Sequence, residues 1–217
     1  RNFLHRYITE TVLARHLPAS MVERASRGEL RMDAEPEKHV CTIVFTDLVG
    51  FTQLSEKLGA EGIGKILNRC LSDLTDIAHR HEATVDKFIG DCSMFVFGVP
   101  EHLDPKEQAK RAVALAKEIH REIPMRYQDH KLRARTGINT GEVVAGNFGS
   151  ERRSDYTVIG PAVNIAARLE SKSKDGRILI GPTTAELLEN SVTLETIGKI
   201  KLKGVSEPIE AYFVAED

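Results

Sequence analysis

The alternation of apolar and polar residues divides most of the chain into short strands and amphipathic helices. An apolar, β-branched run over residues 40–46 predicts a strand, and aliphatic residues recurring on one stripe over 61–81 predict a helix that packs on a sheet. A first helical segment is predicted over 53–58. Two short apolar runs within 84–97 flank a Gly-Asp pair, which is typical of a hairpin whose turn presents an acid.

The second half of the chain continues this pattern, and N-cap and proline signals at Asp104 and Pro105 predict the start of a helix. The expected order is a helix over 105–123, a hairpin of strands 132–139 and 142–148 joined by Thr140 and Gly141, a strand over 156–159, a helix over 161–172, a strand over 177–180, a helix over 182–188, and strands over 194–202 and 209–214. Helices packed on one face of a largely antiparallel sheet make an α+β domain.

The first 38 residues differ from the rest and are predicted to form an N-terminal helical segment, followed by one main domain over 39–217. Near-helical apolar spacing over 7–27, interrupted at Pro18, predicts two short helices, and a polar run over 32–38 predicts a linker. The segment is either a simple connector or a signalling helix that pairs across a dimer. Because the chain starts at Arg1, we expect it to be a piece of a longer protein with an upstream regulatory or sensor domain.

The composition fits a single core and excludes some classes of partner. With 217 residues, of which 41% are hydrophobic, the chain has enough apolar material for one sizeable core. The 30 basic and 32 acidic residues give a formal net charge of −2, so nothing favours nonspecific binding to nucleic acid or to an anionic membrane surface. No apolar run is long enough for a membrane span. Because the net charge is close to zero, we expect no nucleic-acid partner.

The three cysteines, Cys41, Cys70 and Cys92, lie inside apolar segments and lack C-x-x-C spacing. This pattern favours buried thiols in a reducing compartment over disulfides or a zinc site. We therefore expect the main domain to be cytoplasmic, or on the cytosolic side of a membrane if the full-length protein is attached to one.

Candidate chemistry begins in the stretch C-T-I-V-F-T-D-L-V-G-F-T, which carries Asp47 to the end of a strand and then breaks at Gly50. The following V-G-F-T offers backbone N–H groups and the Thr52 hydroxyl before a helix, which suits an anion such as a triphosphate. Asp91 is the second acid at a strand end, and together the two carboxylates favour a divalent cation such as Mg²⁺ or Mn²⁺. Taken singly, each acid also fits an ordinary structural role, Asp47 as a helix cap and Asp91 as a turn residue.

A second pair of polar residues lies in Y-T-V-I-G-P-A-V-N-I-A-A-R-L-E, where Asn164 and Arg168 stand four positions apart on a predicted helix. Residues at this spacing share one helix face, so the two side chains could reach one ligand. The spacing alone equally fits a local cap for Asn164 and a surface ion pair between Arg168 and Glu170 or Glu186.

Four motifs together resemble a known family. In order and spacing, F-T-D-L-V-G-F-T, D-K-F-I-G-D, R-T-G-I-N-T-G and Y-T-V-I-G-P-A-V-N-I-A-A-R resemble the catalytic domain of class III adenylate and guanylate cyclases, from about residue 40 to the C-terminus. The resemblance implies a ferredoxin-like core and a head-to-tail homodimer, whose two active sites lie at the interface and are each built from both chains. A monomer would then be inactive.

The resemblance also implies roles for individual residues. Asp47 and Asp91 match the family's metal-binding aspartates, and Leu48 matches the residue whose carbonyl also contacts metal. Gly50, Phe51 and Thr52 match the family's phosphate loop. Arg135 and Lys203 match its triphosphate-binding side chains, and Lys201 is a less favoured candidate for the role of Lys203. These basic residues fit solvated charges on strand ends as well. Asn164 would orient the ribose, and Arg168 from the partner chain would stabilise charge on the reacting phosphate.

The residues that would select the base are Lys87 and Thr157. Lys87 lies where the family's adenine-selecting lysine lies, and it can only donate, as N1 of adenine requires, whereas guanine carries a hydrogen there. Thr157 departs from the aspartate of many adenylate cyclases, and its hydroxyl can both accept and donate. A Lys/Thr pair resembles the subgroup that includes bicarbonate-responsive bacterial enzymes and the mammalian soluble cyclase, which makes a bicarbonate response a hypothesis.

The predicted function is an adenylate cyclase that converts ATP to 3′,5′-cyclic AMP and pyrophosphate. Two divalent cations would activate the ribose 3′-hydroxyl and hold the triphosphate, while the general base stays open among Asp47, water and the substrate phosphate. One alternative is a guanylate cyclase or dual-specificity enzyme, opposed by Lys87 and permitted by Thr157. The other is a regulatory module that binds nucleotide without turnover, which would be expected to lack a metal-binding acid or the Asn/Arg pair.

Overall fold

The computed structural model describes residues 35–150, 153–189 and 191–216, so the two helices predicted within the first 38 residues lie outside the described part. The strands are β1 (Glu37–Val49), β2 (Thr84–Ile89), β3 (Cys92–Phe97), β4 (Arg133–Ser150), β5 (Arg153–Ile159), β6 (Ile178–Ile180), β7 (Leu194–Ile200) and β8 (Ile209–Val214). The helices are α3 (Phe51–Arg80), α4 (Pro105–Arg126), the 3₁₀ turn η3 (Gln128–His130), α5 (Pro161–Lys172) and α6 (Pro182–Leu188).

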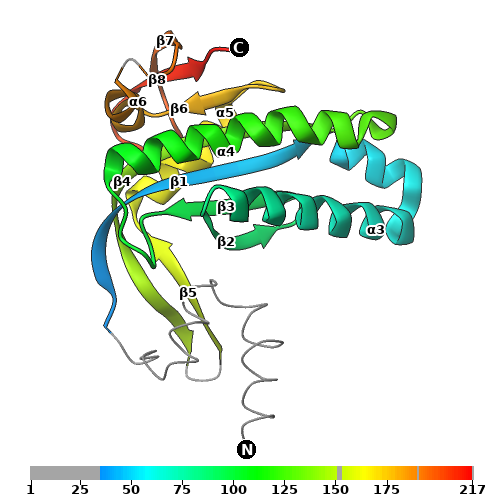
Figure 1. Cartoon of the computed structure of the whole chain (residues 1–217), viewed down its shortest axis with the longest axis horizontal. Helices are drawn as coiled ribbons and strands as arrows, with labels where there is room; N and C mark the ends of the chain where they lie inside the picture. The colour runs from blue at the N-terminus through cyan, green and yellow to red at the C-terminus, as the bar shows by residue number, and fades with distance from the viewer. Residues whose placement is uncertain (1–34, 151–152, 190, 217) are drawn as a thin grey trace, which may run out of the picture.

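The described strands form one mixed sheet in the order β2-β3-β1-β4-β6-β8-β7, with β5 paired to the far half of β4. Every neighbouring pair is antiparallel except β4 and β6. Figure 1 shows the β4–β5 ribbon extending beyond the rest of the sheet. The α+β architecture predicted from the sequence is confirmed.

Helices cover both faces of this sheet, and the prediction that they lie on one face is wrong. Residues of β1 alternate between the faces: Val44 and Leu48 pack with α3 and α4, whereas Ile43 and Phe45 pack with α5 and β5. The amphipathic pattern of α5 identified a buried face, but periodicity carries no information on which side of the sheet a helix lies.

The predicted hairpin over 132–148 is also wrong, because β4 runs straight through the expected turn. Thr140 pairs with Thr42 of β1, and Gly141 pairs with Cys41. A Cβ atom on Gly141 would lie 2.8 Å from the Cβ atom of Ala162 in α5. Glycine is therefore needed here for close packing of a helix on the strand, and not for a turn.

Two helix predictions are confirmed in detail. Gly59 interrupts α3 with φ 68° and ψ 178°, which separates the two predicted helical segments. Asp104 caps α4 by accepting hydrogen bonds from the backbone N–H groups of Lys106 and Glu107. The helix continues past its predicted end, through Pro124 to Arg126. None of the helices in the described ranges is long and apolar enough to cross a membrane.

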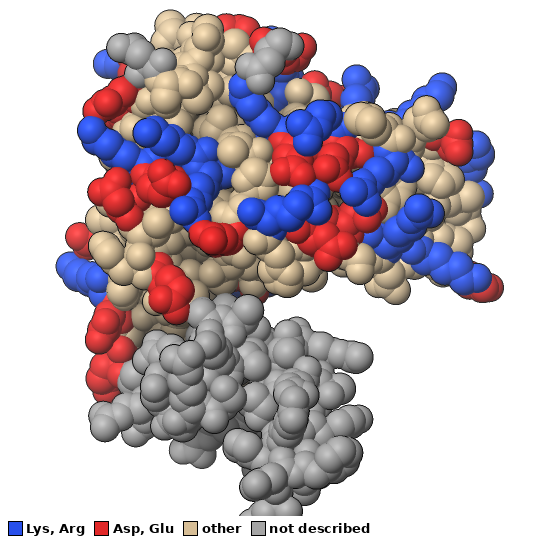
Figure 2. Space-filling view, in the orientation of Figure 1, with Lys and Arg blue, Asp and Glu red and all other residues tan. Residues whose placement is uncertain are grey.

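Acidic and basic side chains intermingle over the outer surface of α3 and α4 (Figure 2). Arg80 of α3 pairs with Glu118 of α4 at 2.6 Å, and Arg126 of α4 pairs with Asp73 of α3 at 2.8 Å. Because both arginines remain partly exposed, such pairs contribute little stability, but they place opposite charges side by side on this face (Figure 2).

The cysteines behave as predicted for buried thiols. Cys41 and Cys70 are fully buried, Cys92 is partly buried, and all of them are free. Burial raises the pKa of Cys41 and of Cys92 to about 12, so these thiols stay protonated at neutral pH.

Candidate active site

The predicted metal-binding acids meet in a cavity of about 240 Å³. The sheet register explains the meeting, because Asp47 lies opposite Cys92 on β3 and opposite Arg135 on β4. The turn before Cys92 brings Asp91 to the same end of the sheet. We call this space the cation cavity; its lining is Asp47, Leu48, Val49, Gly50, Thr52, Gln53, Asp91 and Arg135.

The start of α3 gives the cation cavity an anion-binding wall. Gly50 is the N-cap residue in a left-handed conformation with φ 91°, which glycine adopts without strain, and no side chain of the described residues caps the helix. The first backbone N–H groups of α3 therefore remain available for phosphate oxygens. Thr52 lines the cavity, whereas Phe51 packs against the hydrophobic core. Leu48 is buried and also belongs to the lining of the cavity.

Acidic side chains outnumber basic ones in the lining of the cation cavity, where Asp47 and Asp91 lie with Arg135. Arg135 donates from Nη2 to Oδ2 of Asp47 at 3.0 Å and from Nε to Oε1 of Glu170 at 2.7 Å. Burial raises the pKa of Asp91, and the nearby charge of Asp47 raises it further. Burial likewise raises the pKa of Glu170, against the pull of Arg135. One guanidinium thus serves two carboxylates, and Asp91 has no ion pair of its own in the described residues.

This donor set fits a hard divalent cation that is shared with a phosphate-bearing ligand. Asp47 and Asp91 supply carboxylate oxygens, which Mg²⁺ and Mn²⁺ prefer. Within the described ranges, no cluster of three or more His, Cys, Asp or Glu side chains could hold a metal alone. Two carboxylates leave coordination positions for water and for phosphate oxygens, as is usual for Mg²⁺ sites.

Lys87 and Thr157 lie together, but outside the lining of the cation cavity. Oγ1 of Thr157 donates to both carboxylate oxygens of Asp86, at 2.9 and 2.8 Å, and Nζ of Lys87 lies 3.4 Å from Oδ2 of Asp86. We call these three residues the base cluster. Asp86 is not among the predicted site residues, although an acid inside an apolar strand is a signal in D-K-F-I-G-D.

The predicted pair on α5 points away from the cation cavity of its own chain. Asn164 and Arg168 are both exposed, and neither makes a hydrogen bond or ion pair with a described residue. Glu170 follows Arg168 by two residues, which is roughly 200° around an α-helix, and it faces inward to Arg135. The alternative of a pair between Arg168 and Glu170 is therefore excluded.

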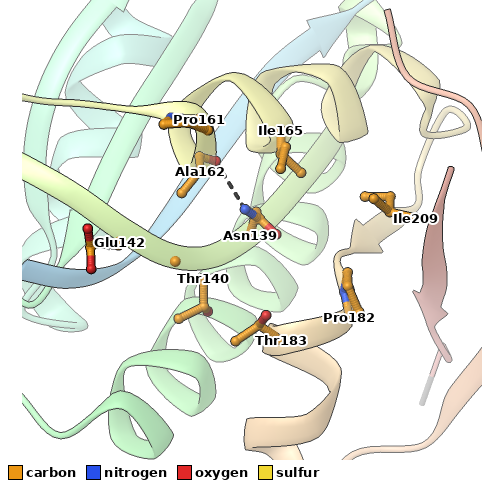
Figure 3. A pocket seen from close by; sticks show the side chains of 10 residues that line it. Asn139, Thr140, Glu142, Pro161, Ala162, Ile165, Pro182, Thr183 and Ile209 are labelled. Carbon is orange, nitrogen blue, oxygen red and sulfur yellow. Dashed lines mark hydrogen bonds between the residues drawn. The ribbon is translucent and has the colours of Figure 1, made fainter. Parts of the chain in front are cut away.

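Two other features lie apart from the acids. Lys201 and Lys203 are exposed between β7 and β8, and neither lines the cation cavity. A larger cavity of about 350 Å³ lies among β4, α5, α6 and β8 (Figure 3). There Nδ2 of Asn139 donates to the carbonyl of Ala162 at 3.1 Å, and Glu142 is the one titratable residue in the lining. None of the predicted site residues lines this second cavity.

Comparisons with known proteins place this geometry in context. The family model described as the adenylate and guanylate cyclase catalytic domain matches residues 32–216. The uncharacterized protein Rv1320c of Mycobacterium tuberculosis is 36% identical over 204 residues, which cover 91% of this chain and 35% of that protein. The chain thus spans about a third of the length of the curated relatives that it matches.

Solved structures agree with the family match. The crystal structure of the adenylyl cyclase CyaB from P. aeruginosa superimposes with a TM-score of 0.82 and 38% identity, covering 85% of this chain and 97% of that one. The crystal structure of the guanylyl cyclase Cya2 gives a TM-score of 0.77 and 36% identity, covering 84% and 94%. The similar structures therefore include cyclases of both base specificities.

Proposed function

The chain belongs to the family of adenylate and guanylate cyclase catalytic domains, and on that premise we propose that it is an adenylate cyclase. It converts ATP to 3′,5′-cyclic AMP and pyrophosphate. The observation that carries the proposal is the cation cavity, in which Asp47, Asp91 and Arg135 face the uncapped start of α3. Acids for divalent cations and N–H donors for phosphate oxygens thus lie within one space of suitable chemistry.

Two divalent cations, Mg²⁺ or Mn²⁺, would be held by Asp47, Asp91 and the carbonyl of Leu48. They would activate the ribose 3′-hydroxyl and neutralise charge on the triphosphate. The N–H groups at the start of α3, the Thr52 hydroxyl and Arg135 bind phosphate oxygens. Arg135 exchanges its contact with Asp47 for the triphosphate, and Lys203 adds a further positive charge. The 3′-oxygen then attacks the α-phosphorus in line and expels pyrophosphate.

The remaining predicted residues act on the ribose and the reacting phosphate. Asn164 orients the ribose by hydrogen bonding, and Arg168 stabilises the charge that grows on the phosphoryl oxygens. Because both side chains point away from the cation cavity of their own chain, we infer that they serve the cavity of a second copy. A head-to-tail homodimer, with each site built from both chains, is therefore part of the proposal.

Base selection is assigned to Lys87, which donates to N1 of adenine, and to Thr157, which accepts from the adenine amino group. The second candidate function is a guanylate cyclase. It is favoured by the similarity to the guanylyl cyclase Cya2 and by the departure of Thr157 from aspartate. Lys87 opposes it, because the hydrogen on N1 of guanine repels a side chain that can only donate.

The same proposal extends to regulation. Since the chain spans about a third of its curated relatives, an upstream regulatory or sensor domain has room in the full-length protein, with the catalytic domain on the cytosolic side. A bicarbonate response follows from the Lys/Thr pair as a hypothesis, and equal rates with bicarbonate and with chloride at fixed pH would exclude it. Removing residues 1–34, which leaves β1 whole, and then measuring dimerisation and activity tests whether the N-terminal segment is a signalling helix or a connector.

The deciding experiment is product analysis after incubation with ATP, or separately with GTP, plus Mg²⁺ or Mn²⁺ at several protein concentrations. We expect cyclic AMP and pyrophosphate, with a specific activity that rises with protein concentration because dimers form the sites. Cyclic GMP as the main product would favour the second candidate. Nucleotide binding that depends on the cation but yields no cyclic product would instead indicate a regulatory module.

A further inference from the structure

A β-bulge on β2 brings two neighbouring residues into contact. Residues next to each other on a strand normally point to opposite faces. The register of β2 on β3 shifts between Val85 and Lys87, which leaves Asp86 as the extra residue. Asp86 and Lys87 can therefore meet, with Nζ of Lys87 3.4 Å from Oδ2 of Asp86.

The carboxylate of Asp86 is buried and surrounded by donors. Its side chain is 3% exposed, whereas that of Lys87 is 43% exposed. Besides Lys87, it accepts hydrogen bonds from the Thr157 hydroxyl, at 2.9 and 2.8 Å, and from the backbone N–H of Val158. Since β5 is not a sheet neighbour of β2, this carboxylate links the β4–β5 ribbon to β2, the strand at one edge of the sheet. It contacts both residues that the proposed function assigns to base selection.

The geometry points to Asp86 as a positioning residue that holds the hydroxyl proton of Thr157, so that Thr157 can only accept a hydrogen bond from the nucleobase. A hydroxyl has one proton and two lone pairs, and an ionised carboxylate has lone pairs alone. When Oγ1 of Thr157 donates to Asp86, only lone pairs remain for a ligand. This inference rests on the proposed function, because it assumes that Lys87 and Thr157 contact the base.

The consequence is a preference for adenine over guanine. The amino group on C6 of adenine donates, and so it matches a lone pair on Thr157. The oxygen on C6 of guanine also accepts, and so it meets Thr157 without a proton between them. From the sequence alone, Thr157 could recognise either base, because a free hydroxyl can both donate and accept a hydrogen bond. The hydrogen bond to Asp86 leaves it only the accepting role. Burial raises the pKa of Asp86, while the donors around it oppose the rise and favour the ionised form.

The test measures the ratio of kcat/KM for ATP to kcat/KM for GTP in one preparation of the full chain, so that the folded fraction cancels. Asp86→Ala removes the acceptor, and Asp86→Asn presents an amide that can donate as well as accept. We expect each to lower the ratio about tenfold, because the freed hydroxyl can then donate to guanine. Thr157→Val should lower it to a similar extent. Adding Asp86→Asn to Thr157→Val should change the ratio no further, because the hydroxyl on which Asp86 acts is already absent.

The matched control is Asp73→Asn, at a carboxylate that also accepts a hydroxyl proton, from Tyr127, but lies on α3 away from the base cluster. It should lower stability and leave the ratio unchanged. An unchanged ratio in both Asp86 variants would overturn the inference. So would a further drop when Asp86→Asn is added to Thr157→Val, since Asp86 would then act through Lys87 or through the fold.

A binding measurement separates this inference from the proposed function. 3′-Deoxy-ATP and 3′-deoxy-GTP lack the attacking hydroxyl, so their equilibrium affinities in the presence of Mn²⁺ report base selection without turnover. If the wild-type chain makes no cyclic product yet prefers 3′-deoxy-ATP, and Asp86→Asn reduces that preference, the proposed function fails and the inference stands. If cyclic AMP forms and the preference is insensitive to Asp86, the inference alone fails.

Discussion

Asp86 and Asp91 belong to the same β2–β3 hairpin, and burial raises the pKa of both, yet their surroundings differ. Donors from Lys87, Thr157 and Val158 surround Asp86. Asp91 faces a second carboxylate, Asp47, across the cation cavity. Asp86 therefore has its partners within the fold and can hold other side chains in place. Among the described residues, Asp91 has its own backbone N–H as a donor and Arg135 as a nearby positive charge but forms no ion pair of its own, and so it suits an external cation.

The same contrast separates the two regions as wholes. The base cluster is internally paired, and so its geometry is set before a ligand arrives. In the cation cavity, Arg135 divides its guanidinium between Asp47 and Glu170, which leaves a surplus of negative charge. Binding of cations and a triphosphate would relieve that surplus. We expect substitutions in the two regions to differ in the sign of their effects as well as in size.

The largest expected effect is a loss of turnover. It tests whether the cation cavity of one chain and the outward face of α5 of a second chain form one active site in a dimer. Asp47→Asn and Arg168→Ala should each reduce turnover roughly 10²–10³-fold, because each removes charge stabilisation of the reacting phosphate. Mixing the two inactive variants should restore about a quarter of the wild-type rate, since half of the dimers are mixed and each mixed dimer has one intact site. Cyclic AMP formation by the mixture measures this directly.

The control for subunit mixing is Asp155→Asn, an exposed acid on β5, which should stay as active as the wild type alone and in mixtures. Failure of the mixture to exceed either variant, although native mass spectrometry shows mixed dimers, would contradict the composite site. Near-normal turnover by Arg168→Ala alone would remove Arg168 from its proposed role.

Substitution of Asp86 should lower the thermal stability of the protein, whereas substitution of Asp91 should raise it. Asp86→Ala leaves the Thr157 hydroxyl and the Val158 N–H without their acceptor, which costs about 1–3 kcal/mol of unfolding free energy. Asp91→Asn removes a partly buried charge that Asp47 repels, and without divalent cations it should raise Tm by about 1–2 °C. Calorimetry in a chelating buffer measures both variants, and a lower Tm for Asp91→Asn would contradict the surplus of negative charge.

Local sequence patterns located the end of β1 and the start of α3 to within three residues, and these positions carry most of the candidate site. Asp47 follows a β-branched run, Gly50 precedes α3, and Gly59 lies between the two helical segments that were predicted. The failures concern contacts between distant segments. Thr157 and Asp86 are 71 residues apart, so their hydrogen bond depends on the bend of the β4–β5 ribbon and on a β-bulge. Gly141 was interpreted as a turn residue, although it is needed for close packing against α5. A glycine required for packing cannot be distinguished in the sequence from one required for a turn.

Cation-induced stabilisation should depend on pH through Asp91. Its raised pKa means that the ionised form costs stability in the metal-free fold above that pKa. As pH falls through the folded pKa toward the ordinary value of 3.8, the folded state takes up the proton first and the cost disappears. A proton then competes with the cation, so the rise in Tm with Mn²⁺ should be largest near neutral pH and shrink under acid conditions. Asp91→Asn should remove most of this pH dependence, and an equal Mn²⁺ effect at all pH values would contradict the assignment.

The smallest expected effect tests whether the two regions act independently. Arg135→Lys keeps the charge, but a lysine cannot bridge Asp47 and Glu170 as the guanidinium does, so we expect a three- to tenfold loss of affinity for both ATP and GTP, roughly equal for the two. The ratio of kcat/KM for ATP to that for GTP should stay within about twofold of the wild type, because additivity holds for sites without shared partners. The control is Arg177→Lys, where Arg177 also pairs with an acid, Glu195, but lies outside both regions; it should change neither value. A shift in the ratio caused by Arg135→Lys would mean that base selection depends on how the triphosphate is held, and then the base cluster could not set specificity alone.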